Sequence, residues 1–145
     1  IVLKIFQKVS KNKTVKLFKS HNPQYRDGEQ MRDFIYVKDV INIIKWFIDN
    51  KKINGIYNVG TGNPRSFYDL ATSVFKNTNV KNRIKYIDTP KNIKEQYQYF
   101  TKANIKKLRN AGYKKRFFSL EDGVKDYIRN HLIINPWFMN IILAQ

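Results

Sequence analysis

The chain has 145 residues, 42% of them hydrophobic and 14% aromatic, which predicts one compact domain with a packed core rather than a disordered segment. It contains no cysteine and two histidines, so the composition excludes a disulfide framework and argues against a metal enzyme. The 28 lysine and arginine residues outnumber 11 acidic residues and give a net charge of +17, which favours an acidic binding partner.

The basic residues are scattered along the whole chain. Lysines occur in every predicted element beside many asparagines and isoleucines, a bias expected of surface positions in an AT-rich genome. Because the basic residues form no stripe, the sequence argues against nucleic acid as the partner. A nucleic-acid-binding module that stacks bases on Tyr97, Tyr99 and Phe100 stays an alternative.

The start of the chain carries no signal-peptide pattern, and no apolar run approaches the ~20 residues that a membrane helix needs. These features predict a soluble, cytoplasmic protein with no membrane partner. The first residue is Ile1 rather than methionine, and an apolar stretch follows to Phe6, which predicts a start in the middle of a domain.

The first half of the chain predicts a helix, two strands and a second helix. Residues 1–10 have apolar side chains at helical spacing, and residues 13–20 have the β-branched and aromatic composition of a strand. A polar loop covers residues 21–30, and residues 33–37 predict the second strand. Asp39 is expected to cap a helix that runs to about Asn50, since its carboxylate can accept backbone N–H groups of the first turn.

The second half predicts further alternation of strands and helices. Residues 56–59 predict a short strand that runs into Gly60-Thr-Gly62. Ser66 and Asp69 predict a capping box for a helix to about Asn77, and residues 83–87 predict another strand. Residues 88–100 predict a long loop, and the last two helices are expected at residues 102–110, with Gly112 as the stop, and at residues 119–131.

This alternation predicts an α/β fold. The strands are too few for a complete doubly wound sheet, so the fold is expected to be an incomplete part that finishes its sheet against another segment. Residues 1–131 are expected to form this part, and the apolar tail at residues 132–145 has no assigned role.

Two motifs leave alternatives open on the residues alone. The sequence Gly60-Thr-Gly62 between a strand and a helix resembles a dinucleotide-binding turn, but Arg65 occupies the place of the third small residue, so a tight turn is the favoured interpretation. Arg32 precedes a strand suited to burial, and its guanidinium either grips a diphosphate or forms a surface ion pair with Asp33 or Glu29.

Several segments resemble a known family. Arg-Asp-Phe-Ile-Tyr-Val-Lys-Asp-Val at residues 32–40, and Gly-Ile-Tyr-Asn-Val-Gly-Thr-Gly at residues 55–62 followed by Ser66, resemble the carboxy-terminal half of extended short-chain dehydrogenase/reductases that act on nucleotide sugars. Residues 95–104, residues 108–113 and the later Phe117 and Glu-Asp-Gly-Val resemble the ADP-glyceromanno-heptose 6-epimerases in particular. The resemblance covers roughly residues 16–127 and implies the substrate-binding part of a Rossmann-type fold.

The resemblance implies a binding role for six residues. They share a predicted position beside a nucleotide sugar, ADP-D-glycero-β-D-manno-heptose: the nucleotide part falls to Phe18, Lys19, Ser20 and His21, the diphosphate to Arg32, and the sugar nucleotide to Tyr97. Tyr97 also has a packing interpretation, because clustered aromatic residues often belong to a core. Lys4 stands where the family usually has a histidine, which puts that contact in doubt.

The resemblance also implies a reaction and a cofactor. In the family a bound NADP removes hydride from C6″ and returns it to the other face, with a tyrosine held near a lysine as base. The chain has no Tyr-x-x-x-Lys and no Gly-rich cofactor turn, so we expect no catalytic residue in it, an inactive fragment, and NADP bound mainly by an absent amino-terminal part. An intact homo-oligomer, a pentamer in the family, is also implied. Another nucleotide-sugar epimerase or dehydratase, for instance one using UDP-hexoses, is the second interpretation.

Overall fold

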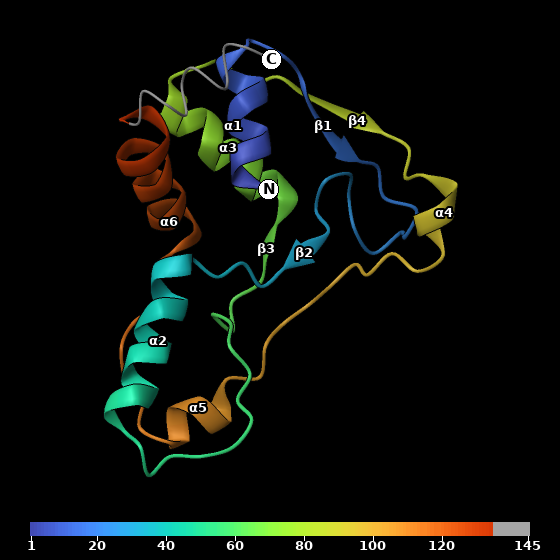
Figure 1. Ribbon diagram of the computed structural model, residues 1–145. Helices are drawn as coiled ribbons and strands as arrows, with labels where there is room; N and C mark the ends of the chain where they lie inside the picture. Colours follow the sequence, from blue (N-terminus) through green and yellow to red (C-terminus); the bar gives the residue numbers. More distant parts are fainter. Residues whose placement is uncertain (135–145) are drawn as a thin grey trace.

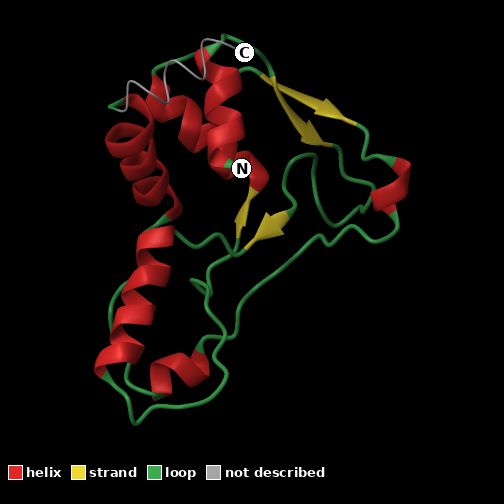
Figure 2. Cartoon of the chain, in the orientation of Figure 1, coloured by secondary structure: helices red, strands yellow, loops and turns green. Residues whose placement is uncertain are grey.

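Helices and short strands alternate in the computed structural model, which describes residues 1–134 (Figure 1). Strands β1 and β4 pair in parallel, and strands β2 and β3 pair antiparallel, so the predicted α/β class is confirmed (Figure 2). The elements in chain order are α1 (Val2–Ser10), β1 (Val15–Phe18), β2 (Met31–Arg32), α2 (Val37–Asp49), β3 (Arg65–Ser66), α3 (Phe67–Thr78), β4 (Ile84–Ile87), α4 (Lys91–Lys94), α5 (Lys106–Asn110), α6 (Leu120–Tyr127) and η1 (Ile128–Ile133).

The larger core lies between α1, α3 and α6, which Figure 1 shows beside one another. The predicted helix at residues 1–10 is confirmed as α1, because Ile5, Phe6 and Val9 recur on one face and are all buried. The predicted capping box of α3 is also confirmed: the Ser66 hydroxyl accepts the backbone N–H of Asp69 at 2.9 Å, and the Asp69 carboxylate accepts that of Ser66 at 3.2 Å.

A second, smaller core lies between α2 and α5, at the opposite end of the molecule in Figure 1. Ile43, Leu108 and Tyr113 form its buried centre, and Trp46 and Phe47 pack against them. The opposite face of α2 is apolar as well but exposed, and this exposed stripe consists of Val37, Ile41, Ile44 and Ile48. Helix α2 is therefore apolar on both sides, which is typical of a helix that is covered on both sides.

The predicted strand at residues 33–37 and the predicted cap at Asp39 are both wrong. Strand β2 ends at Arg32 because the chain turns there, with the Phe34 N–H donated to the Arg32 carbonyl at 3.1 Å. Helix α2 then begins at Val37, so Asp39 lies inside its first turn and makes no cap hydrogen bond. Its buried carboxylate instead accepts the backbone N–H of Phe118 at 2.9 Å.

Two further elements differ from expectation. Residues 56–59 form no strand, and Ile56 is 88% exposed, because no neighbouring strand in the described part of the chain offers backbone partners. The helix predicted at residues 102–110 begins only at Lys106, since the Ala103 N–H is donated to the Asp33 carboxylate and the preceding segment is held in that contact. The predicted long loop at 88–100 contains the short helix α4.

The helix predicted at residues 119–131 is confirmed in α6, which Ser119 caps by accepting the Asp122 N–H at 3.0 Å. It continues as the π-helix η1, whose Leu132 is fully buried in the larger core. The predicted boundary at residue 131 falls inside η1, and the rest of the predicted tail, residues 135–145, lies outside the described residues. Within residues 1–134, no helix has the length and apolar character needed to cross a bilayer.

Candidate functional site

Arg32 and Tyr97 come together at the end of strand β2. The guanidinium carbon of Arg32 lies 5.6 Å from the ring centroid of Tyr97 and 5.6 Å from that of Phe67, so the cation sits against two aromatic rings. One guanidinium nitrogen donates to the carbonyl of Met31 at 2.8 Å. Among the described residues, no carboxylate forms an ion pair with Arg32, so the alternative ion pair with Asp33 or Glu29 is absent.

An aromatic cluster extends from this pair. Tyr97 packs edge to face against Phe18 at 5.9 Å, against His21 at 6.4 Å and against Tyr99 at 5.5 Å between ring centroids. Tyr25 adds a further ring, tilted against Tyr99 at 5.1 Å. Three predicted binding residues, Phe18, His21 and Tyr97, therefore lie in one cluster with Arg32 at its edge.

Burial raises the pKa of the Tyr97 hydroxyl above its ordinary value, and the neighbouring Tyr99 adds to the shift, while the positive charge of Arg32 opposes it. Tyr97 is therefore a neutral phenol at physiological pH. As a neutral phenol it can donate one hydrogen bond and present its ring face or edge to a ligand.

The predicted residues Lys19 and Ser20 lie beside the cluster, but their polar atoms have partners inside the protein. The Lys19 ammonium lies 3.1 Å from the Asp88 carboxylate in an exposed ion pair. The Ser20 hydroxyl donates to the Asn22 carbonyl at 2.8 Å, and the Ser20 N–H donates to Asp27 at 2.7 Å. Ser20 thus shapes the loop after β1.

Both ring nitrogens of His21 are engaged as well. The Tyr99 hydroxyl accepts the backbone N–H of His21 at 2.8 Å and lies 2.8 Å from His21 Nδ1. Since that oxygen already accepts one hydrogen bond, it can donate its proton to Nδ1, which leaves Nε2 to donate to the Lys94 carbonyl at 3.1 Å. His21 therefore ties the loop after β1 to the segment after α4 and offers a ligand its ring rather than a free nitrogen.

The Gly60-Thr-Gly62 turn lies next to the same strand and is held by Asp33. The backbone N–H groups of Thr61 and Gly62 donate to the Asp33 carboxylate at 2.8 and 2.9 Å. Gly62 has φ +72°, a left-handed conformation that glycine adopts without strain, which supports the tight-turn interpretation. These N–H groups face a carboxylate, so this turn does not fit the pyrophosphate of a dinucleotide cofactor.

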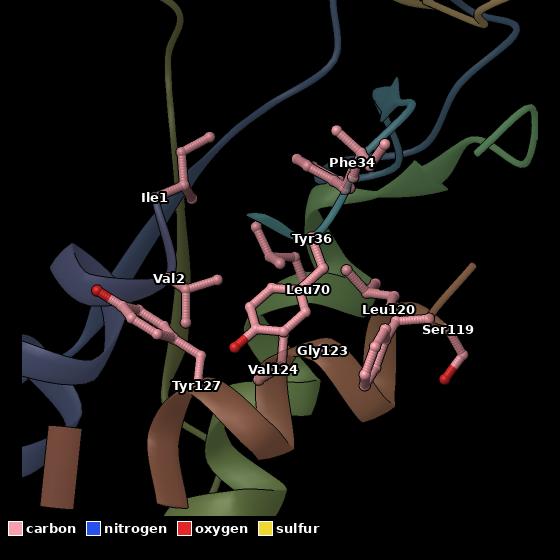
Figure 3. A pocket seen from close by; sticks show the side chains of 12 residues that line it. Ile1, Val2, Phe34, Tyr36, Leu70, Ser119, Leu120, Gly123, Val124 and Tyr127 are labelled. Carbon is pink, nitrogen blue, oxygen red and sulfur yellow. The ribbon is translucent and has the colours of Figure 1, made fainter. Parts of the chain in front are cut away.

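An apolar cavity of about 240 Å³ lies between α1, α6 and the segment before α2 (Figure 3). Figure 3 shows Ile1, Tyr36 and Tyr127 among the side chains around it. None of the six predicted binding residues lines this cavity. Phe34 links the two regions, because it lines the cavity and packs edge to face on Phe67 at 5.5 Å, beneath Arg32.

Sequence reasoning missed Phe67 and assigned Asp33 only to a possible ion pair. Phe67 follows directly on the helix cap Ser66, so antiparallel pairing of Arg32 with Arg65 brings its ring under the guanidinium. A charged residue in a segment otherwise suited to burial was the available signal for Asp33, because a carboxylate that loses part of its water must find hydrogen-bond donors within the protein.

The comparisons with known proteins point to nucleotide-sugar epimerases. The model of the NAD dependent epimerase/dehydratase family matches residues 1–60. The chain is 44% identical over 132 residues to the ADP-L-glycero-D-manno-heptose-6-epimerase of Nitratidesulfovibrio vulgaris (strain DP4), which covers 91% of this chain and 41% of that protein. It is 46% identical over 138 residues to the enzyme of the same name from Fusobacterium nucleatum, over 91% of this chain and 42% of that protein.

Solved structures show the same relationship. The Helicobacter pylori ADP-L-glycero-D-manno-heptose-6-epimerase superposes with a TM-score of 0.69 at 28% identity, over 89% of this chain and 36% of that chain. The Thermus thermophilus UDP-glucose 4-epimerase, at 22% identity and a TM-score of 0.69 over 90% of this chain and 40% of that one, shares the fold. The chain thus spans about two fifths of the length of its curated relatives. Over about two fifths of their length, the chain is therefore similar to proteins of the NAD dependent epimerase/dehydratase family.

Proposed function

We propose that this chain is the substrate-binding part of an ADP-L-glycero-D-manno-heptose-6-epimerase. The intact enzyme would convert ADP-D-glycero-β-D-manno-heptose to its L-glycero epimer at C6, for synthesis of the lipopolysaccharide inner core. The observation that carries the proposal is the convergence of Arg32 with Tyr97 and Phe67 in a chain 44% identical to an enzyme of that name.

Arg32 suits a diphosphate for two reasons. Its guanidinium has no carboxylate partner in the described part of the chain, and the rings of Tyr97 and Phe67 hold it away from bulk water on two sides. A planar guanidinium can donate two parallel hydrogen bonds to a phosphate, each charge-assisted bond contributing about 1.5–3 kcal/mol when shielded. We place the nucleotide beside Phe18, Lys19, Ser20 and His21, which adjoin Tyr97.

The oxidation and reduction at C6 fall to residues outside this chain in the proposal. The sequence has no Tyr-x-x-x-Lys, and the Asp33 carboxylate occupies the N–H groups of its Gly60-Thr-Gly62 turn. A nicotinamide cofactor, which we propose to be NADP, would therefore be held by other segments of the intact enzyme. The exposed apolar stripe of α2 supports further chain packed against this part. We also propose that the intact enzyme is a cytoplasmic homo-oligomer.

The test joins this chain to the amino-terminal part of the Nitratidesulfovibrio vulgaris relative. The joined enzyme is expected to epimerise ADP-D-glycero-β-D-manno-heptose with added NADP, whereas the amino-terminal part alone is expected to be inactive on it. UDP-galactose serves as the competing substrate. Turnover of UDP-galactose in place of the ADP-heptose would replace the proposal with the second interpretation, a different nucleotide-sugar epimerase.

A further inference from the structure

The carboxylate of Asp33 collects hydrogen bonds from two segments that are distant in the sequence. One oxygen accepts the N–H of Thr61 at 2.8 Å and also its hydroxyl. The other accepts the N–H of Gly62 at 2.9 Å and that of Ala103 at 3.0 Å. The Asp33 carboxylate thus accepts hydrogen bonds from four donors. Through them it connects the end of β2 with the Gly60-Thr-Gly62 turn and with the segment before α5.

The segment that ends at Ala103 also carries Tyr97, and it runs beside strand β2. The Met31 N–H donates to the Tyr99 carbonyl at 2.8 Å, and the Thr101 N–H donates to the Met31 carbonyl at 3.3 Å. The hydrogen bond from the Ala103 N–H to the Asp33 carboxylate is a further contact between this segment and the end of β2. Arg32 thus lies between two anchors, Met31 and Asp33, that both bind the segment bearing Tyr97.

The packing around Gly60 shows how closely the segments approach. A Cβ atom at Gly60 would lie 2.7 Å from an Asp33 carboxylate oxygen and would overlap the methyl group of Ala103. Only glycine leaves room for the carboxylate to reach both N–H donors of the turn. Burial alone would raise the pKa of Asp33, but hydrogen bonds from Thr61, Ala103 and Gly62 hold it below its ordinary value, so the carboxylate stays charged.

We propose that Asp33 is a positioning residue for the diphosphate site, because its carboxylate fixes the Tyr97 segment against β2 and so sets the guanidinium of Arg32 against the Tyr97 ring. The effect on ligand affinity rests on the proposed function. The effect on geometry does not, so the two can be tested separately. Asp33 itself faces the turn and has no role in contacting the ligand.

The geometric test uses the 145-residue chain in solution. In the Asp33→Asn variant one carboxylate oxygen becomes an NH₂ group, so at least one backbone N–H loses its acceptor. We expect the amides of Thr61, Gly62 and Ala103 to exchange with solvent roughly tenfold faster, as expected for the loss of a charge-assisted hydrogen bond. We also expect the nuclear Overhauser contacts between the side chains of Arg32 and Tyr97 to weaken. Retention of these contacts at wild-type intensity would overturn the inference.

Two further variants distinguish a specific loss of the Arg32–Tyr97 contacts from general destabilisation of the protein. Thr61→Val removes one donor without changing any charge and is expected to weaken the same contacts to a smaller degree. Asp126→Asn is the matched control, because Asp126 also accepts several hydrogen bonds, from Tyr36, Lys38 and Asn130, and none from the Gly60-Thr-Gly62 turn or the segment that bears Tyr97. This control is expected to lower stability while leaving the Arg32–Tyr97 contacts unchanged. If Asp126→Asn weakens them equally, Asp33 has no specific positioning role.

The affinity test uses ADP as the probe and calorimetric titration of the same chain. We expect Asp33→Asn to raise the Kd for ADP about tenfold, because one charge-assisted hydrogen bond that orders the site is lost. Asp126→Asn should leave the Kd unchanged. A wild-type chain that binds no ADP would count against the proposed function, whereas the contacts of Arg32 with Tyr97 would still decide the positioning role.

Discussion

The guanidinium of Arg32 and the ring of Tyr97 lie 5.6 Å apart, although one belongs to strand β2 and the other to the segment after α4. The cation also faces Phe67, at the start of α3, at the same distance. A cation held between two aromatic faces is partly shielded from water and oriented by its neighbours. An anionic ligand would find this guanidinium already in place, which lowers the entropic cost of binding.

Two replacements of Arg32 distinguish the contribution of its positive charge to substrate binding from that of the planar guanidinium. In the joined enzyme, Arg32→Lys keeps the charge but loses the planar fork and the contact with Tyr97, so we expect the KM for ADP-heptose to rise about tenfold, with a larger rise in Arg32→Ala. Affinity for NADP should be unchanged in both. Steady-state kinetics with varied ADP-heptose and with varied NADP measure the two effects. Lys16→Met, a loss of charge at an exposed position of β1, is the control, and an unchanged KM in Arg32→Ala would remove Arg32 from the site.

Removing the hydroxyl of Tyr99 should loosen the loop after β1. In Tyr99→Phe, the His21 N–H and Nδ1 both lose their partner. Because His21 is exposed and water can replace the lost hydroxyl, we expect a loss of only about 0.5–1.5 kcal/mol in the free energy of unfolding. Urea unfolding measures it, together with faster exchange of the His21 amide. Tyr25→Phe removes a hydroxyl outside this network and should leave that amide unaffected. Equal exchange in the two variants would contradict the assignment.

Gly60→Ala should destabilise the protein through a steric clash. The added methyl group would meet both the Ala103 methyl and the Asp33 carboxylate, so we expect a loss of about 1–3 kcal/mol in the free energy of unfolding. The double variant Gly60→Ala/Ala103→Gly removes one of these clashes and should recover part of the loss. Chemical unfolding of the three proteins provides the measurement. A single variant as stable as the wild type would show that the turn can move away from Asp33.

The free energy of unfolding should fall at acid pH because the Asp126 carboxylate becomes protonated. Hydrogen bonds from Lys38, Tyr36 and Asn130 lower the pKa of its carboxyl group from 3.8 to about 2. A lowered pKa means that the charged form stabilises the folded state, so the contribution is complete above pH 4 and is lost as the pH falls towards 2. Asp126→Asn should cost about 1–2 kcal/mol at pH 7 and nearly nothing at pH 2.

Urea unfolding of wild type and Asp126→Asn at pH 7, 4 and 2 tests this pH dependence. Ser119 and Asp122 form a separate pair at the start of α6, so Asp122→Asn serves as a carboxylate control on the same helix. A difference between wild type and Asp126→Asn that stays constant over this range would show that Asp126 is not the titrating group.

Local patterns predicted some elements well and others poorly. The capping box at Ser66 and the amphipathic face of α1 involve residues three or four positions apart, so a single helical turn decides them. The strand predicted at 56–59 failed because a strand needs a neighbour, and the described part of the chain provides none. Asp39 was a plausible cap, but its carboxylate accepts the N–H of Phe118, which lies far along the sequence.

The sequence by itself determined the α/β class, the helix starts at Ser66 and Ser119, and the similarity to nucleotide-sugar epimerases, because these depend on residue types at fixed spacing. Only the tertiary structure decided that Arg32 lies between Tyr97 and Phe67 and that one carboxylate, Asp33, joins three segments. Those contacts join residues that are distant in the chain, and their formation depends on how the intervening helices pack, which no local pattern encodes.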